Sequence, residues 1–323
     1  MGYVAGETIL DDEFNAFVAS SSDPFGFNHF AGTGATVYGL GQPAIPTVAG
    51  GTTTVAAAQW NSLLAGLDSI ANHTNDTMTA RTAVTAGDTI AIKSAVVADL
   101  ATLAASVAGG SVNATAISVG SELQSSRASG RFAGSHIVEH TVTFANANNM
   151  RFFFNAGGKI RVNLTRVANG GSSATSKDDS VDEMITAMGD FDIASIASTR
   201  SGTTETLTTD GLAIGFQDVT TSYQTVFLLT QANGTYTSMT LKGEIKGNAT
   251  AGSTANVTIK MSLTDADSGD ILYTDGNVSS VDQFENFIGV TDFATKLILP
   301  TTAQGLDPVY TLSGSAETSN TTA

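Results

Sequence analysis

One stretch of the sequence has the residue types and spacing of a known zinc-binding pattern, running from His136 through Ile137, Val138 and Glu139 to His140. On a helix, two histidines four positions apart lie on one face and can bind a single Zn²⁺. The apolar residues in and around this stretch are typical of a strand instead. On a strand the two histidines would stand roughly 13 Å apart, at about 3.3 Å per residue. We therefore expect no metal here.

A second stretch, Asp265–Asp270 followed by Asp275, resembles part of a calcium-binding loop. Carboxylates at alternate positions can converge on a hard cation. The spacing departs from that of a helix–loop–helix calcium site, because Gly269 stands where a ligand is needed and no glutamate closes the loop. The expected structure is a solvated β-turn, and we assign no metal to it.

The sequence offers no arrangement of nucleophile, base and acid that indicates an enzyme. It contains no Gly-x-Ser-x-Gly motif, and the stretch Gly157–Ile160 lacks the earlier glycine and the following hydroxyl of a phosphate-binding loop. The acids between Asp178 and Glu183 stand at the expected start of a helix over Ser180–Phe191, where they favour the positive end of the helix dipole. We predict a non-enzymatic protein with no catalytic residues and no cofactor.

Two short helices with a weak internal repeat are expected in residues 1–78. Glu7–Val18 aligns with Thr52–Leu64, and in both an aromatic residue precedes an asparagine. Asp11 is a suitable N-cap for the first helix. Leucines follow Trp60 at helical spacing and give the second helix an apolar face. This region is interpreted as an attachment part.

A helix over Thr79–Val107 and a linker are expected to fill residues 79–130. Its apolar stripe fits either a helix packed within a small domain or a stalk helix in an oligomer. From residue 131 the apolar period becomes two, and Asn233-Gly234 separates two alternating runs as in a hairpin. We predict a β-rich domain over 131–312 and a polar tail over 313–323. The fold class is α+β, mainly β, in which an N-terminal helical segment precedes an antiparallel β-sandwich-like domain.

The composition argues against several classes of partner. Thirty acidic residues against 14 basic ones give a net charge of -16, which does not suit a nucleic-acid-binding surface. No apolar run approaches the roughly 20 residues of a membrane span. There are no cysteines, and acids occupy the place where a signal peptide has positive charge. Synthesis in a reducing cytoplasm is expected.

The stretch Arg151–Val167 combines three consecutive phenylalanines with four of the chain's basic residues. If Phe152–Phe154 form a strand, their side chains alternate between two faces, and one of these could meet another copy of the chain. The glycines at 157 and 158 predict a turn with positive φ. The basic side chains of the following strand have two interpretations: a solvated face with ion pairs inside one chain, or a bridge to an acidic neighbour.

The same stretch carries a resemblance to a known family. Its letters RFFFNAGGKIRVNL resemble the FFN-x-GG-x-I-R signature of virion structural proteins of tailed phages, especially marine and cyanobacterial myophages. The earlier stretch Val37–Pro43, VYGLGQP, resembles the family's YGYGQ pattern, from which Leu40 departs at the second tyrosine. In order of elements, the resemblance extends to about Asp270.

The resemblance implies a non-enzymatic virion protein of the tail fibre, neck or tail-associated type, made in the host cytoplasm. We expect a homo-oligomer of three copies that contacts other virion proteins of the neck, tail or baseplate. The alternative is a receptor-binding module that recognises a host surface glycan or protein; a polysaccharide-degrading spike would need a longer, repetitive chain. The candidate interface residues are Trp60, Phe152, Phe153, Phe154, Gly157, Gly158, Lys159 and Arg161.

Overall fold

The computed structural model describes residues 11–21, 26–32, 39–50, 55–88, 93–113, 117–126, 131–132, 134–167, 176–202, 207–210, 213–231, 239–250, 253–265, 287–288, 290–300 and 312–322. The chain divides into two compact units, each built from three separate stretches. The helical unit comprises Met1–Ser118, Ala145–Gly158 and Leu299–Thr311. The β unit comprises Val119–Phe144, Lys159–Ile298 and Leu312–Ala323. The two therefore do not follow one another as simple halves of the sequence.

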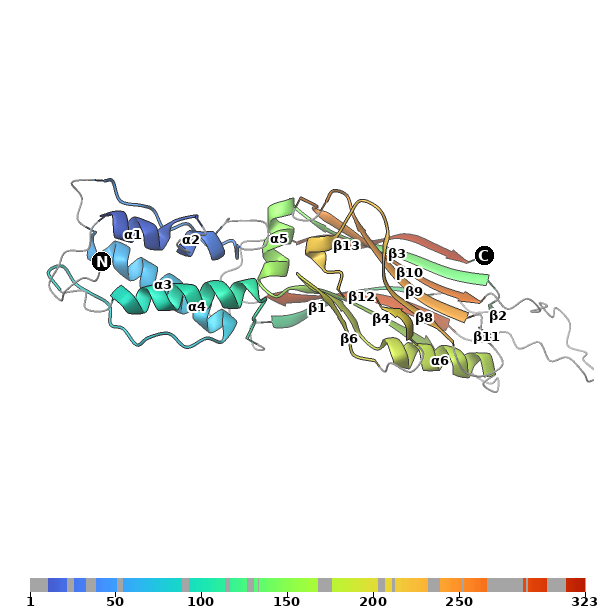
Figure 1. Cartoon of the computed structure of the whole chain (residues 1–323). Coiled ribbons are helices and arrows are strands. Elements are labelled where there is room, and N and C mark those ends of the chain that lie inside the picture. The colour runs from blue at the N-terminus through green and yellow to red at the C-terminus, as the bar shows by residue number, and fades with distance from the viewer. Residues whose placement is uncertain are drawn as a thin grey trace, which may run out of the picture. The chain divides into compact units, whose positions relative to one another are not determined.

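The described residues of the helical unit form the helices (Figure 1) α1 Asp11–Val18, α2 Phe27–Phe30, α3 Ala57–Thr74, α4 Lys93–Ala108 and α5 Ala147–Asn155. The expected helix over Thr79–Val107 was too long, because it begins only at Lys93. In the residues before Lys93, side chains bind the main-chain groups that a helix would use. Asn61 binds both the N–H and the carbonyl of Val84, and Asp88 accepts a hydrogen bond from the N–H of Thr85.

One hydrophobic core holds the helical unit together. Trp60 is buried on α3 and meets Phe17 of α1 edge to face, with 6.1 Å between the ring centroids. On α4 a buried stripe that includes Leu100 and Leu103 joins the same core. The structure thus agrees with the packed interpretation of α4. Aromatic and leucine side chains of this size each contribute roughly 1.5–3 kcal/mol when buried.

Helix α5 corrects the expectation of a strand at Phe152–Phe154. Asn146 caps the helix by accepting a hydrogen bond of 3.0 Å from the N–H of Asn149. All three phenylalanines are buried, and the rings of Phe153 and Phe154 meet edge to face. Because this helix packs in the helical unit, the aromatic run is explained without a second copy of the chain.

The β unit contains two larger sheets (Figure 1). The first has the order β1-β12-β4-β5-β6 and the second β13-β3-β10-β9-β8-β7. Their bounds are β1 Ile117–Ser126, β3 Gly134–Phe144, β4 Lys159–Val167, β5 Phe191–Ile193, β6 Ser198–Arg200, β7 Leu207–Asp210, β8 Gln224–Thr230, β9 Met239–Gly247, β10 Asn256–Asp265, β12 Val290–Pro300 and β13 Leu312–Thr322. A small pair joins β2 Arg131–Phe132 to β11 Phe287–Ile288, and α6 spans Ser176–Met188. The predicted fold class, α+β with an antiparallel sandwich-like domain, is confirmed.

Contacts between the two larger sheets show which strands face one another. His136 of β3 bonds to Thr291 of β12, and the rings of Phe191 on β5 and Phe227 on β8 lie 4.9 Å apart. Strand β3 therefore faces β12, and β5 faces β8. Along β4 alternate residues from Ile160 to Leu164 are buried, as period-two patterning requires.

Two further expectations have clear outcomes. The C-terminal residues were expected to be a polar tail, but Leu312–Thr322 form β13, which pairs with β3. Serine and threonine suit a strand as well as a tail, and pairing with β3 decides between them. Strands β8 and β9 are antiparallel, with Thr230 opposite Thr240. This agrees with the predicted hairpin, whose Asn233-Gly234 turn falls outside the described residues, as does most of Asp265–Asp270 with Asp275.

Candidate functional site

The two motif stretches that carry the phage resemblance meet in the helical unit. Asn155 of α5 donates a hydrogen bond of 3.0 Å from Nδ2 to the carbonyl oxygen of Gly39. Nearby, Gly41 has a φ of +70°, and a Cβ added there would lie 2.8 Å from the ring of Phe152. A side chain at position 41 would therefore be strained twice, by its backbone and by this ring. The described part of the first stretch, residues 39–43, and the FFNAGG stretch therefore form one structural site.

Four asparagines that directly follow a buried aromatic residue bind main-chain groups of other segments. Their pairs are Asn15 with Val48, Asn28 with Ile45, Asn61 with Val84 and Asn155 with Gly39. In the first three, the side-chain amide donates to the carbonyl and accepts from the N–H of the same residue, at 2.8–2.9 Å. Each of these three amides thus forms the two hydrogen bonds with one residue that a neighbouring strand would otherwise form with its main chain. We call these contacts the asparagine clamps.

Three of the clamps converge on one extended segment, residues 39–48, which we call the strap. Asn15, Asn28 and Asn155 come from three different helices, α1, α2 and α5. Buried Leu40, Ile45 and Val48 anchor the strap in the core of the helical unit. Pro43 and Pro46 restrict its backbone before it binds. The strap therefore ties together helices that are far apart in the sequence.

The internal repeat singled out two of the clamp asparagines but did not predict their role. It matched Phe14-Asn15 with Trp60-Asn61, and in the structure both asparagines are clamps. Sequence reasoning missed Phe27-Asn28 and the role of Phe154-Asn155. The signal that could have found them is the aromatic–asparagine dipeptide itself, which occurs at these four places in the sequence.

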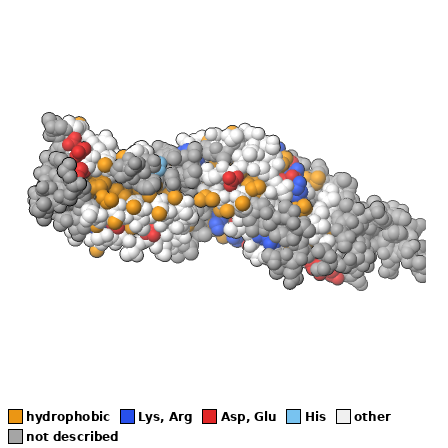
Figure 2. All heavy atoms as spheres, in the orientation of Figure 1, with side chains coloured by type: hydrophobic (Ala, Val, Ile, Leu, Met, Phe, Trp, Pro, Cys, Tyr) orange, Lys and Arg blue, Asp and Glu red, His pale blue; other side chains and the backbone are white. Residues whose placement is uncertain are grey.

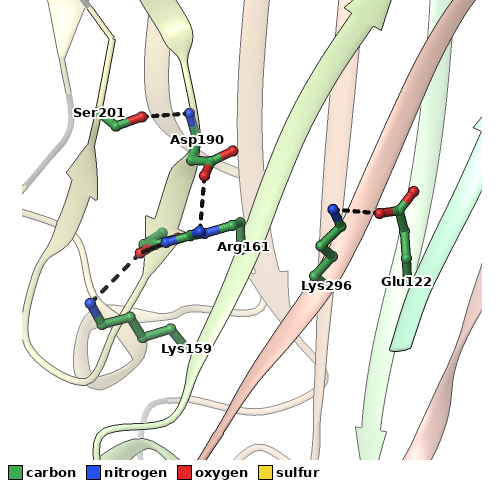
Figure 3. Close-up of polar contacts among 7 residues, drawn as sticks. Glu122, Lys159, Arg161, Asp190, Ser201 and Lys296 are labelled. Carbon is green, nitrogen blue, oxygen red and sulfur yellow. Dashed lines mark hydrogen bonds and ion pairs between the residues drawn. The ribbon is translucent and has the colours of Figure 1, made fainter. Parts of the chain in front are cut away.

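The basic strand β4 is paired within its own chain (Figure 3). Arg161 binds both carboxylate oxygens of Asp192, at 2.7 and 2.9 Å, and its Nη1 lies 2.9 Å from Asp190. Lys159 lies 3.6 Å from Asp192. The bidentate bond with Asp192 raises the pKa of Arg161 above its usual value. These contacts match the interpretation of ion pairs inside one chain.

The ion pairs extend across the sheet. Lys296 of β12 stands opposite Arg161 in register and pairs with Glu122 of β1 at 2.6 Å (Figure 3). Asp192 stands opposite Arg161 on the other side, on β5. A row of four charges thus crosses four strands, with Glu122 and Asp192 at its ends and the two cations between them. Lateral pairs of this kind hold neighbouring strands in register, although each exposed pair contributes only about 0–1 kcal/mol.

The remaining predicted interface residues lie inside the helical unit. Trp60 is 2% exposed, and the three phenylalanines are no more than 5% exposed. Gly157 has the expected positive φ, +86°. Gly158 does not have a positive φ. Glycine is needed there because a Cβ would lie 2.5 Å from the carbonyl oxygen of Phe153. These positions are explained by packing within the chain, and their interface role stays a prediction.

The two histidines of the zinc-like stretch bridge the sheets. His136 Nδ1 and Thr291 Oγ1 are 2.8 Å apart, and so are His140 Nδ1 and Thr295 Oγ1. Both rings are buried, and His136 packs on Phe293 with 5.1 Å between centroids. The stretch lies on strand β3, as the sequence predicted. Among the described residues, no group of three or more His, Cys, Asp or Glu side chains is placed to hold a metal ion.

A second charged cluster, missed by sequence reasoning, lies around Tyr223 in the β unit. Its ring lies 4.1 Å from the ammonium groups of both Lys246 and Lys260, and its hydroxyl donates to Glu139 at 2.6 Å. Lys260 also pairs with Glu244 at 2.6 Å. Burial, and then the bond to Glu139, raise the pKa of the tyrosine. On the face drawn in Figure 2, blue Lys and Arg side chains lie close to red Asp and Glu side chains.

The helical unit contains a groove of about 640 Å³ between α3 and the extended residues that follow it. Asp68 and Asn72 of α3 line one side, and Asp76, Thr79 and Arg81 line the other. Burial lowers the pKa of Arg81, and the charge of Asp68 partly offsets this. The groove offers carboxylate, amide and hydroxyl groups, which can hydrogen-bond a polar ligand.

No helix in the described part of the chain is long and apolar enough to span a membrane. Comparison with known proteins adds no relative: the chain matches no family model, no curated protein and no solved structure. The conclusion that these observations allow is a two-unit α+β protein whose two motif stretches build a single site around the strap.

Proposed function

We propose that this protein is a structural component of a tailed-phage virion, of the fibre, neck or tail-associated type, and that it assembles as a homotrimer. The observation that carries the proposal is the bond between Asn155 and Gly39. It joins the two stretches that resemble the phage family, so the resemblance concerns one folded site and not two unrelated short matches. The protein acts by assembly and not by catalysis.

The distribution of charge supports a building element. Lys159 and Arg161 of β4, and Lys260 beside Tyr223, have carboxylate partners inside the chain, at 2.6–3.6 Å. Arg166 likewise pairs with Asp182 of α6. Such lateral pairs stabilise a surface without creating a reactive group. The helical unit would contact other virion proteins of the neck, tail or baseplate, and the β unit would project.

Location in the particle is the direct test. Purified virions from an infected culture would be analysed by mass spectrometry and labelled with antibodies raised against the β unit. We expect the chain in the particle at a fixed copy number that is a multiple of three, with label at the neck, tail or baseplate. Its absence from purified particles, with abundant free protein in the lysate, would overturn the proposal.

A receptor-binding module is the second candidate, and the groove of the helical unit favours it. Asp68 and Asn72 lie along one side of α3 and present acceptors suited to sugar hydroxyls. A glycan array probed with the labelled protein tests this function. Binding that is lost in Asp68→Ala and kept in Asp179→Ala, an exposed acid outside the groove, would support it. If the protein bound no host surface glycan, the structural role would remain as the single candidate function.

A further inference from the structure

The two larger sheets have long edges on one side and short edges on the other. On one side the edge strands are β1, of 10 residues, and β13, of 11. On the other they are β6, of 3 residues, and β7, of 4. The sides follow from the contacts between the sheets, since β12 beside β1 faces β3 beside β13, and β5 beside β6 faces β8 beside β7.

Edge strands expose main-chain donors and acceptors that can pair with another chain. Proteins commonly protect an edge by making it short, by adding lysine or proline, or by a β-bulge. The short strands β6 and β7 follow the first of these rules. Neither β1 nor β13 contains a lysine or a proline. Strand β13 has two register shifts against β3, which leave the regular runs 314–317 and 319–322 between and after them.

Strand β1 lacks the usual protection, and it carries exposed apolar surface. Val119 is 67% exposed, the largest value among the exposed large hydrophobic side chains of the described residues. The one carboxylate on β1, that of Glu122, is paired with Lys296 of the adjacent strand. A neighbouring strand would therefore cover apolar surface without facing an unpaired charge.

We propose that β1 of one copy of this chain pairs with β13 of a second copy. Because both long edges are on one side of the sandwich, each chain can offer β1 to one neighbour and β13 to the other. Pairing of this head-to-tail kind gives a closed ring if the rotation closes, and three copies are the number in the proposed virion component. The inference rests on the homo-oligomer of the proposed function and specifies its contact.

Engineered disulfides test the pairing directly, because the natural chain has no cysteine. Ser121→Cys on β1 would be combined in turn with Ser315→Cys, Ser319→Cys and Thr321→Cys on β13. Residues directly opposite on paired strands are close enough for a disulfide. After mild oxidation, at least one combination should give a covalent trimer on a non-reducing gel, and Ser121→Cys alone should give none. Covalent dimers from Ser121→Cys alone would mean that β1 pairs with β1 and would overturn the inference.

A charge on the edge gives an independent test with a matched control. Val119→Lys should reduce the mass in light scattering from three chains to one at micromolar concentration, with an unchanged melting temperature. Val167→Lys is the control, since Val167 is 58% exposed but lies on β4, an interior strand that pairs with β12 at this residue. A Val119→Lys protein that remains trimeric, or a trimer that forms no disulfide in any combination, would overturn the edge pairing and leave the proposed function standing. A wild-type monomer would overturn both the pairing and the homotrimer.

Discussion

Nδ2 of Asn155 lies 3.0 Å from the carbonyl oxygen of Gly39, a residue 116 positions earlier in the chain. This bond explains why α5 belongs to the helical unit although the residues after it form a strand. The chain returns from the β unit to complete the core around the strap. The stability of the helical unit therefore depends on residues on both sides of β1 and β3.

Loss of an asparagine clamp should destabilise the helical unit. Asn28→Ala removes two buried hydrogen bonds to Ile45 and leaves its N–H and carbonyl unsatisfied. Each such group costs about 1–3 kcal/mol, so for two groups we expect a loss of roughly 2–6 kcal/mol in the free energy of unfolding. Urea denaturation followed by circular dichroism measures it. Asn72→Ala, at an exposed position of α3, is the control, and equal midpoints for the two variants would refute the role of the clamp.

A side chain at Gly158 should disturb α5. A Cβ there would lie 2.5 Å from the carbonyl oxygen and 2.6 Å from the ring of Phe153, closer than atoms of a folded protein approach. Gly158→Ala should lower stability by about 1–3 kcal/mol, as overpacking commonly does, and Gly158→Val by more. Gly109→Ala, whose nearest new contact is 3.3 Å away, should change it much less. Thermal melting of the three variants distinguishes them, and an unaffected Gly158→Val protein would contradict the packing described.

Loss of the Arg161 side chain should destabilise the sheet that contains β4 and β5. On a solvated face, the ion pairs of Lys159 and Arg161 would each contribute only about 0–1 kcal/mol. In the structure Asp192 is only 6% exposed and depends on Arg161 for two hydrogen bonds. Removing that partner leaves the buried carboxylate with the more distant Lys159, 3.6 Å away, in place of a bidentate pair. Arg161→Ala should lower stability by about 1–3 kcal/mol.

Lys159→Ala serves as the comparison for the charged strand. Its ammonium group is 3.6 Å from Asp192, and its side chain is 34% exposed, so little stability should be lost. The double variant Arg161→Ala with Asp192→Ala should recover part of the loss, because the unpaired carboxylate is gone. Denaturant midpoints at low salt measure all three. Similar midpoints for Arg161→Ala and Lys159→Ala would show that the bidentate pair stabilises the protein no more than the contact of Lys159 does.

The buried His73 should make the protein less stable in mild acid. Burial lowers the pKa of this imidazole to about 4, against 6.5 when it is exposed, and a bond to the main chain of Ala156 opposes the shift only in part. Between these values the unfolded chain binds the proton and the folded chain does not. Stability is therefore complete above about pH 6.5 and falls as the pH drops toward 4, by up to roughly 3 kcal/mol at about 1.4 kcal/mol per unit.

Comparison with His73→Gln isolates this effect from the carboxylates that also titrate in acid. The difference in unfolding free energy between the wild type and His73→Gln should narrow as the pH falls from 7 to 4. The wild type loses stability over this range because its unfolded chain binds a proton at His73, whereas the glutamine binds none. Denaturation at several pH values gives the curve. A constant difference over that range would show that His73 does not titrate with a lowered pKa.

Local pattern predicted the elements whose own residues decide their structure. Alternating residues around His136 and along β4 predicted strands, and the spacing after Trp60 predicted α3. The aromatic run at Phe152–Phe154 was assigned to a strand because its phenylalanines favour one locally. The cap at Asn146 and the core around the strap reversed that preference, and neither can be read from nearby residues.

In the candidate sites too, nearby residues predicted local features but not contacts with distant parts of the chain. The turn at Gly157 followed from residue type, since only glycine adopts its backbone angles without cost. The partners of Arg161 did not, because Asp190 and Asp192 come from a strand about 30 residues later. Residues 39–48 form neither a helix nor a strand, as their glycines and prolines favour, but the asparagines that hold them come from three helices and could not be identified from the segment itself.

The bridges from His136 to Thr291 and from His140 to Thr295 have a mechanical consequence. Both partners advance by four residues, so β3 and β12 run in the same direction across the two layers. A force that slides one sheet along the other must stretch both bridges at once, whereas a force that peels the sheets apart from one end strains them one after the other. The sandwich should therefore resist tension along its strands far better than opening at its end, which suits a part that bears load lengthwise.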